Sequence, residues 1–270
     1  MAWTNPFASP DFVHVVGSKD IEGSLRLVEF PGGFCCYSHT SIEETEFIYN
    51  EIFVRKEYVN EGLTLDRCKC IVDAGANIGM FSLFALLTNR NAVVYAFEPM
   101  RKTYEILVRN LEYHHLSNAH TYNVALGKED NSRRTFNYYP NLAGHSTAHP
   151  EGHDAERQEV EQAFGKQRTD WAFTSEVQIA NVRTLSSIIK ENNIKAIDFL
   201  KVDTEGDELC VLSGILPQQY ENIGQLCIEV HSEALSKEVQ RLLSKLGYRV
   251  SLMEGIAPGE TQNVYAKRQR

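Results

Sequence analysis

Residues 71–82, with the sequence IVDAGANIGMFS, constrain the fold of this 270-residue chain more than any other stretch. A short apolar run of strand type leads into Asp73, and from Ile78 the apolar residues recur at helical spacing. The backbone must turn sharply between them, and Gly75 and Gly79 can adopt backbone angles that are closed to other residues. Their missing side chains also let a ligand approach the main chain and the first helical amides. The stretch therefore predicts a strand, a glycine turn and a helix start in succession, with a ligand at the turn.

An ordinary strand-to-helix turn, which any parallel α/β protein needs, is the alternative interpretation of this stretch. The spacing of Asp73, Gly75 and Gly79 also differs from the G-x-G-x-x-G pattern of dinucleotide-binding folds, which disfavours an NAD-dependent oxidoreductase. Asp73 would repel a phosphate at close range, so we expect the turn to wrap an uncharged or cationic part of the ligand.

Four motifs taken together resemble the FkbM family of class I S-adenosylmethionine-dependent methyltransferases. They are DAGANIG at residues 73–79, AFEP at 96–99, NVALG at 123–127 and KVDTEGDE at 201–208. The resemblance covers roughly residues 46–233, and the four motifs in this order are specific as a set. It implies a Rossmann-like α/β fold whose seven-stranded, mostly parallel sheet has an antiparallel last strand and helices on both faces.

The resemblance also implies S-adenosylmethionine as the cofactor and the residues that bind it. Glu98 follows the predicted strand 93–97, and an acidic residue at the carboxyl end of such a strand accepts both hydrogen bonds of a ribose diol. The backbone near residues 123–125 is expected beside the adenine, and Tyr58 beside the methionine part. A tyrosine packed on an amphipathic helix is the alternative for Tyr58. The full set of cofactor residues is Tyr58, Asp73, Gly75, Ala76, Asn77, Gly79, Glu98, Pro99, Asn123, Val124, Ala125 and Asp203.

Two strand ends further along the chain supply the candidate catalytic residues. The predicted strand 196–202 leads into Asp203, Thr204 and Glu205, and the predicted strand 225–231 ends with Glu229 and His231. A carboxylate and histidine set at one crevice serves either as a general base or as a site for a divalent metal such as Mg²⁺. We expect Asp203, Glu229 and His231 in one of these roles. The alternative for Asp203 is that it caps a helix starting near Gly206.

His145 is a further catalytic candidate. It lies in the segment GHS at residues 144–146, which in similar proteins lies near the mouth of the active site. A neutral imidazole can remove a proton from a substrate hydroxyl at neutral pH. A surface histidine without a catalytic role is the alternative.

The chain divides into a small front section and one larger domain. Residues 1–60, called the cover here, contain a hairpin predicted at 25–37 and a helix capped by Ser41 that runs to about Phe53. Residues 61–270 form the methyltransferase domain. An acidic insertion at about 140–176, called the lid here, has no clear periodic pattern of its own.

We interpret the lid as a segment that selects the substrate. Trp171 and Phe173 near its end would line an apolar substrate slot. The alternative is a solvated helical excursion that these two aromatic side chains pin to the domain.

Composition limits the partners of the chain. A net charge of −9 and a pI of about 5.5 disfavour non-specific electrostatic binding to nucleic acid. No run of about 18 apolar residues and no secretory signal pattern is found, so we expect a cytoplasmic protein without a membrane partner. The six cysteines are expected to be reduced thiols. A zinc site is disfavoured, because their spacing does not match that of the usual zinc-binding cysteines.

The predicted reaction is O-methylation of a hydroxyl on a sugar, a polyketide or another secondary metabolite. We expect a small-molecule or carrier-bound acceptor as the partner, and a homodimer is a further expectation. The alternatives are N-methylation of a small molecule and a non-catalytic protein that binds S-adenosylmethionine or acts as a scaffold. The number of polar groups expected at one crevice favours an enzyme over a scaffold.

Overall fold

The computed structural model describes residues 10–252 and 262–269, except for the side chains of residues 152–156 and 159. The described strands are β1 (Gly17–Glu22), β2 (Leu25–Glu29), β3 (Cys35–Ser38), β4 (Cys70–Ala74), β5 (Val93–Phe97), β6 (Ala119–Tyr122), β7 (Ala125–Leu126), β8 (Ser132–Tyr138), β9 (Glu176–Arg183), β10 (Ile197–Val202), β11 (Ile223–Val230), β12 (Tyr248–Leu252) and β13 (Gln262–Arg268). The described helices are α1 (Ile42–Tyr49), α2 (Met80–Thr88), α3 (Arg101–Tyr113), α4 (Asp154–Phe164), α5 (Lys166–Ala172), α6 (Leu185–Glu191), α7 (Glu208–Ser213) and α8 (Glu233–Lys245).

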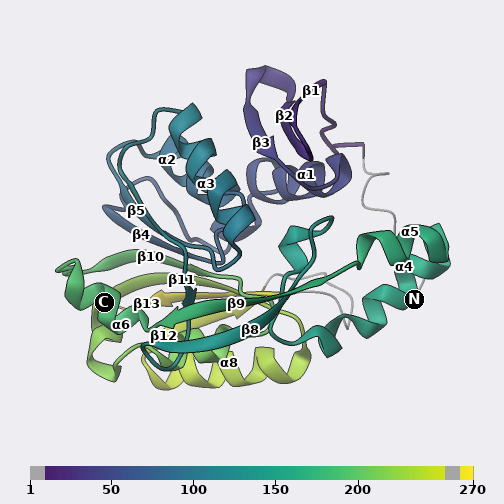
Figure 1. The fold of residues 1–270 in the computed structure, drawn as a ribbon. Helices are drawn as coiled ribbons and strands as arrows, with labels where there is room; N and C mark the ends of the chain where they lie inside the picture. Colours follow the sequence, from purple (N-terminus) through teal and green to yellow (C-terminus); the bar gives the residue numbers. More distant parts are fainter. Residues whose placement is uncertain (1–9, 253–261, 270) are drawn as a thin grey trace.

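The central sheet has seven strands among the described residues, in the order β12-β13-β11-β10-β4-β5-β6 (Figure 1). Strands β11, β10, β4, β5 and β6 are parallel, and β13 runs antiparallel to both of its neighbours. The predicted fold class is thereby confirmed, including the antiparallel last strand. Met253, which the sequence pattern added to the strand β12, lies outside the described residues.

Helices cover both faces of this sheet. Alternate residues of each strand point to opposite sides, so both faces present side chains that pack against helices. On one side Ile71 and Phe199 join the buried cluster that contains α2 and α3. On the other side Val72 and Leu200 join the cluster that contains α6, α7 and α8. The strands are nearly continuous apolar runs, as expected for a parallel sheet that is buried on both faces.

The cover is a three-stranded antiparallel sheet followed by α1. Its hairpin β2–β3 was predicted, and Ser41 caps α1 as expected, because its Oγ accepts a hydrogen bond from the amide of Glu44 at 3.0 Å. Helix α1 continues as a π-helix over Asn50–Val54, which turns the chain towards the sheet. The cover and α2 share one apolar cluster, and the domain boundary near residue 60 stays a prediction.

The lid begins after β8 and ends at β9, two long antiparallel strands of a separate sheet with the order β7-β9-β8. Where irregular structure was expected, the lid contains α4 and α5 (Figure 1). The lid sequence has no clear hydrophobic periodicity, because polar contacts hold much of these helices in place. Examples are the contacts of Asp170 with Arg157 and Lys166. Phe173 is buried against Tyr139, as predicted for a pinning aromatic.

Trp171 differs from Phe173, because 49% of it is exposed on the lid surface. It lines an open surface depression of about 360 Å³ together with Phe164, Gln167 and Arg168. The predicted role of Trp171 in a substrate slot stays a prediction.

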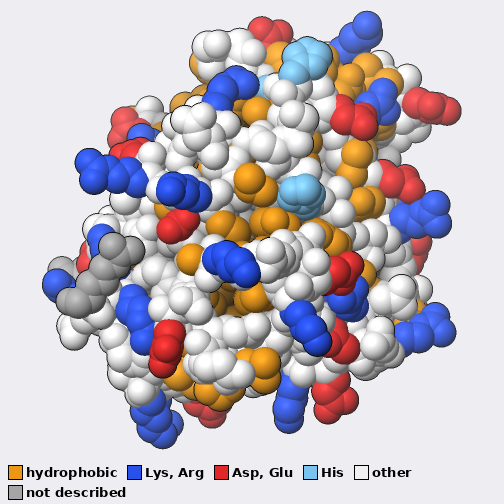
Figure 2. Space-filling model, turned by 90° about the vertical axis from the view of Figure 1, so that its left-hand side faces the viewer, with side chains coloured by type: hydrophobic (Ala, Val, Ile, Leu, Met, Phe, Trp, Pro, Cys, Tyr) orange, Lys and Arg blue, Asp and Glu red, His pale blue; other side chains and the backbone are white. Residues whose placement is uncertain are grey.

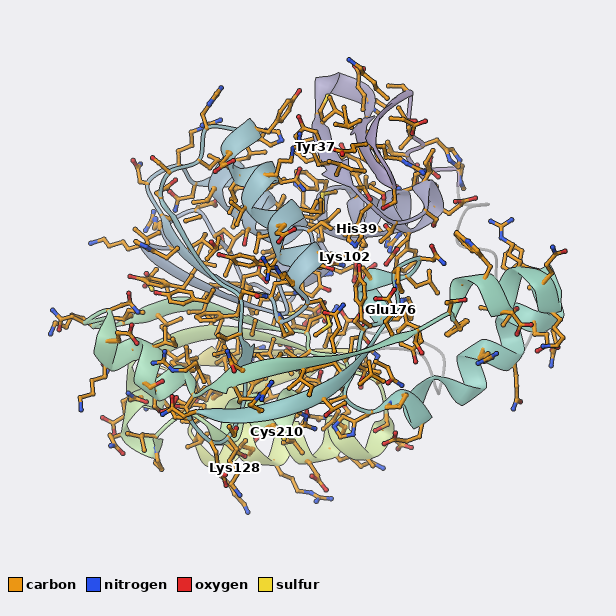
Figure 3. The ribbon with its side chains drawn as sticks, viewed as in Figure 1. Tyr37, His39, Lys102, Lys128, Glu176 and Cys210 are labelled. Carbon is orange, nitrogen blue, oxygen red and sulfur yellow. The ribbon has the colours of Figure 1, made fainter. Side chains whose placement is uncertain are left out.

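The cover meets the strand β8 at a buried polar contact of His39. Figure 3 labels His39 and, close to it, Lys102 of α3. Nε2 of His39 lies 2.8 Å from the hydroxyl of Tyr138, and the ammonium of Lys102 lies over the same tyrosine ring. Burial and the nearby charge of Lys102 lower the pKa of His39 to about 4. His39 is therefore a neutral hydrogen-bonding group at physiological pH, and it joins the cover to the base of the lid.

The described part of the chain carries charges of both signs on the face shown in Figure 2, where lysine, arginine, aspartate and glutamate side chains are interspersed. Within residues 10–252 and 262–269, no helix is both long and apolar enough to cross a lipid bilayer. All six cysteines lie within these residues, and each thiol is free.

Candidate active site

The glycine turn after β4 packs directly against the end of β10. Gly75 has a φ of +77°, and a Cβ atom at this residue would stand 1.6 Å from the carbonyl oxygen of Asp203. The amides of Gly75 and Ala76 both donate to the carbonyl of Phe97 at the end of β5. Only glycine allows this approach, because the left-handed conformation and the space both exclude a side chain. Gly79 is similar, with a φ of +90°, and a Cβ atom there would stand 2.6 Å from the side chain of Leu107.

Glu98 lies at the carboxyl end of β5, beside the glycine turn. Its Oε2 accepts from the amide of Asn77 at 2.9 Å, and its Oε1 accepts from the amide of Met100 at 2.8 Å. Burial raises the pKa of Glu98 to about 7, against the lowering effect of these two amides. A carboxylate has about four acceptor positions, so the two that these amides leave are available to a diol.

The predicted adenine segment lies next to Glu98. Nδ2 of Asn123 donates to the carbonyl of Glu98 at 2.9 Å and to that of Pro99 at 3.1 Å. Val124 is partly buried, and Ala125 is buried at the start of β7. The structure therefore brings the predicted ribose and adenine residues together at neighbouring strand ends.

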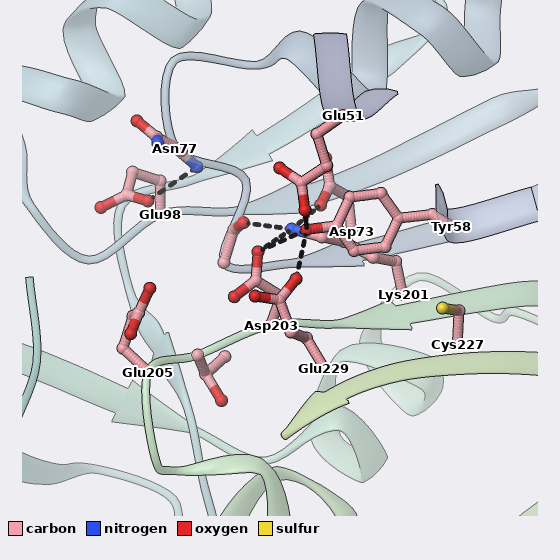
Figure 4. Close-up of polar contacts among 12 residues, drawn as sticks. Glu51, Tyr58, Asp73, Asn77, Glu98, Lys201, Asp203, Glu205, Cys227 and Glu229 are labelled. Carbon is pink, nitrogen blue, oxygen red and sulfur yellow. Dashed lines mark hydrogen bonds and ion pairs between the residues drawn. The ribbon is translucent and has the colours of Figure 1, made fainter. Parts of the chain in front are cut away.

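Lys201 is a buried cation at the centre of the site (Figure 4). Its Nζ donates to the carbonyl of Gly75 at 2.7 Å and lies 3.0 Å from Asp203 and 3.5 Å from Asp73. Burial alone would lower the pKa of Lys201, but Asp203 and Asp73 outweigh this effect and raise it. Asp73 is fully buried and accepts a hydrogen bond from the hydroxyl of Ser82 at 2.7 Å, so it connects the start of the turn to α2.

The hydroxyl of Tyr58 faces three carboxylates. It lies 2.6 Å from Glu229, 3.1 Å from Asp203 and 3.2 Å from Glu51 (Figure 4). Burial and the mutual repulsion of these carboxylates raise the pKa of Glu51 to about 8 and raise that of Glu229 well above its ordinary value. The segment after α1 thus forms an acidic cluster with the residues that follow β10 and end β11.

Glu205 and His231 form a second group beside Asp203. Nε2 of His231 lies 3.5 Å from Oε2 of Glu205, and one ligand atom from each of the three residues lies within 4.8 Å of the others. The structure thus brings the predicted metal residues Asp203 and His231 together with Glu205, whereas Glu229 points to Tyr58. Burial lowers the pKa of His231, but Glu205, Glu208 and Asp203 outweigh burial and raise it.

The alternative role of Asp203 as a helix cap is not what the structure shows. Helix α7 begins at Glu208, whose Oε1 accepts from the amides of Thr204 and Gly206 at 3.1 Å and 3.0 Å. Glu208 therefore satisfies the free amides of the loop, and Asp203 is left to contact Lys201 and Tyr58.

The loop at the start of the lid lies against both the cover and the site. Burial raises the pKa of Glu44 on α1, and the charge of His145 partly offsets this rise. The same charge opposes the rise in the pKa of His231, so His145 lies within electrostatic reach of both groups. The buried Thr147 donates from Oγ1 to the carbonyl of Glu205 at 2.5 Å. This contact fixes Glu205, whose φ of +53° is unusual for a residue with a side chain.

Sequence reasoning left several residues of the site without a role. Lys201 was visible as a lysine inside an apolar strand, two residues before Asp203, and a charge in such a strand needs a buried partner. Glu51 and Glu44 gave only a helix pattern, and Thr147 gave no signal. Their roles depend on how the cover and the lid fold back onto the sheet.

The family description "Methyltransferase FkbM domain" matches residues 73–250 of this chain, which contain the glycine turn, Glu98 and the Asp203 loop. The chain belongs to the FkbM methyltransferase family. It is 32% identical over 231 residues to "Methyltransferase 1" of Beauveria bassiana strain ARSEF 2860, which covers 84% of this chain and 91% of that protein. The FkbM protein of Streptomyces tacrolimicus, a 31-O-demethyl-FK506 methyltransferase, is 32% identical over 244 residues, covering 86% and 91%.

Solved structures also resemble this FkbM family member. TrmK of M. capricolum, solved with S-adenosylhomocysteine, has a TM-score of 0.44 and 12% sequence identity, and the match covers 75% of this chain and 63% of that one.

Proposed function

We propose that this chain transfers the methyl group of S-adenosylmethionine to a hydroxyl oxygen of a small-molecule or carrier-bound acceptor. The observation that carries this proposal is the pairing of Glu98 with the glycine turn, because a carboxylate held by two amides beside a side-chain-free turn suits a ribose diol. FkbM family membership supports methyl transfer.

The remaining cofactor contacts follow from the positions of the acidic groups. Glu51, Asp203 and Glu229 surround the hydroxyl of Tyr58. A cation beside them would stabilise the charged forms of Glu51 and Glu229, whose pKa values are raised, so the cluster suits the ammonium and sulfonium groups of the methionine part. The adenine would lie along residues 123–125, next to Glu98. In this arrangement Asp203, Glu205 and His231 would lie on the side of the site where the acceptor meets the sulfonium methyl.

Methyl transfer needs the acceptor oxygen in line with the methyl–sulfur bond, and holding the two in a near-attack geometry supplies most of the catalysis. His231 and His145 are the groups proposed to take the hydroxyl proton. As the new carbon–oxygen bond forms, the carbon–sulfur bond breaks and its electron pair returns to sulfur, which gives neutral S-adenosylhomocysteine.

The proposed acceptor class is a sugar, a polyketide or another secondary metabolite. The relative from Streptomyces tacrolimicus supports an oxygen acceptor, because its name specifies a 31-O-demethyl compound. A radiolabelled S-adenosylmethionine assay against a panel of glycosides, macrolides and carrier-bound acyl groups tests this class. Transfer to amines alone would replace the O-methyl proposal with N-methylation.

A Glu98→Gln variant is expected to bind S-adenosylhomocysteine about tenfold to a hundredfold more weakly, the effect of losing hydrogen bonds to a charged group. Because the pKa of Glu98 is about 7, the wild-type affinity should rise between pH 6 and pH 8 as the carboxyl group loses its proton. The variant should lack this part of the pH dependence. Calorimetric titration at several pH values measures both effects.

Glu105→Gln is the matched control, since Glu105 is an exposed glutamate of α3 that pairs with Arg101. Its affinity should equal that of the wild type. A folded Glu98→Gln protein with wild-type affinity would remove Glu98 from the ribose site, and a wild-type protein that binds neither S-adenosylmethionine nor its product would overturn the proposed function.

A further inference from the structure

We propose that Asp203, Glu205 and His231 bind one hard divalent cation, Mg²⁺ or Mn²⁺, on the acceptor side of the site. Binding of the cation follows from these side chains alone. Its role in the reaction rests on the proposed function.

The three residues come from the carboxyl ends of two neighbouring parallel strands. Asp203 and Glu205 follow β10, His231 follows β11, and Val202 is the register partner of Ile228. The ligand atoms lie within 4.8 Å of one another, and opposite ligands of a Mg²⁺ ion stand about 4.2 Å apart. Small side-chain rotations therefore suffice to bring the donors onto one ion.

Asp203 has one carboxylate oxygen outside its described contacts. Both described contacts of Asp203, with Lys201 and Tyr58, fall on Oδ2, so Oδ1 is the oxygen left for an ion. The side chains of Glu205 and His231 are 16% and 30% exposed, so an ion and its water reach them from the solvent.

Glu208 gives an independent reason for a cation at this place. It is fully buried, its Oε1 accepts from the Thr204 and Gly206 amides, and its Oε2 accepts no hydrogen bond from any described residue. Thr204 and Gly206 flank Glu205, so the Glu208 carboxylate lies beside the loop that carries two of the proposed ligands. A buried carboxylate oxygen without a donor is costly unless positive charge lies near it. A divalent ion on His231 supplies that charge.

The donor set indicates which ion fits. Two carboxylates and one imidazole suit Mg²⁺ or Mn²⁺ better than a thiolate-seeking metal, and three protein ligands leave three octahedral positions for water or for an acceptor oxygen. The ion would lower the pKa of an acceptor hydroxyl at this place, and with His231 as a ligand, His145 is the group proposed to take up the released proton.

The test is a titration of chelator-treated full-length protein with Mn²⁺ alone, followed by the electron paramagnetic resonance signal of free Mn²⁺. One site per chain is expected. Glu205→Gln and His231→Gln should each weaken binding at least tenfold, whereas Glu229→Gln should keep it, because Glu229 contacts Tyr58 instead. This pair of glutamates separates the proposed ligand set from one that contains Glu229.

Circular dichroism checks the fold of each variant, because Glu229 also faces the proposed cofactor groups and S-adenosylhomocysteine affinity would not report the fold alone. Wild-type protein that does not bind Mn²⁺, or binding lost in Glu229→Gln but kept in Glu205→Gln, would overturn the inference. Mn²⁺ binding by a protein that binds no cofactor would instead leave the cation site standing and contradict the proposed function.

Discussion

A Lys201→Met variant is expected to have a free energy of unfolding about 3–5 kcal/mol below that of the wild type, the usual effect of removing one partner from a buried ion pair. Lys201 is buried between Asp73 and Asp203 and donates to the carbonyl of Gly75, so its loss leaves a fully buried aspartate without its cation. Urea denaturation measures the change, and cofactor binding should weaken with it because the glycine turn loses a contact.

The effect of Lys201→Met should depend on pH in a defined direction. The fold raises the pKa of Lys201, so its stabilising effect is complete below the unfolded pKa of about 10.4 and is lost only above it. In the variant, Asp73 can become neutral by taking up a proton at low pH. The loss of stability relative to the wild type should therefore be larger at pH 8 than at pH 5. Lys237→Met, which removes an exposed pair with Glu233, should change stability by less than about 0.5 kcal/mol. Equal stability of the two variants would contradict a buried ionic centre.

Gly75→Ala should destabilise the chain by about 2–5 kcal/mol and abolish cofactor binding. A left-handed alanine costs about 1–2 kcal/mol, and the overlap of its methyl group with the carbonyl of Asp203 adds the roughly 1–3 kcal/mol of an overpacked core. Relieving the overlap separates the ends of β4 and β10, which breaks the hydrogen bond from the Asp203 amide to the Ala74 carbonyl.

Gly62→Ala isolates the conformational part of this effect. Gly62 has a φ of +81°, close to that of Gly75, but a methyl group there meets no described atom within 4 Å. The free energy of unfolding of the Gly62→Ala variant should therefore fall by about 1–2 kcal/mol, and its cofactor affinity should stay unchanged. If Gly75→Ala matched Gly62→Ala in both stability and affinity for S-adenosylhomocysteine, the close contact between the turn and Asp203 would be refuted.

The central sheet could be predicted from the sequence because each strand end has a local signal. The glycine turn, the Glu98-Pro99 pair and the acidic run after β10 are all short-range patterns, and the parallel fold brings their carboxyl ends to one edge. The helix cap Ser41 was predicted in the same way, since a cap is decided within four residues.

The contacts that complete the site depend on long-range packing, and the sequence alone does not give them. Tyr58 reaches Glu229 across 171 residues, and Gly144 reaches Glu44 across 100. Neither pair has a periodic or local pattern. The helices of the lid were anticipated only by the alternative interpretation of the insertion, and their bounds were not predicted. Hydrophobic periodicity finds helices that bury an apolar face, whereas α4 and α5 are held largely by charged side chains.

The place of the lid in the β8–β9 hairpin has an evolutionary consequence. Tyr138 and Glu176, where the insertion leaves and rejoins the sheet, are register partners, so the two ends stay together whatever lies between them. Doubling the length of such a loop costs only about 0.6 kcal/mol of closure entropy. The lid can therefore change in length during evolution while the pairing of β8 with β9 is kept.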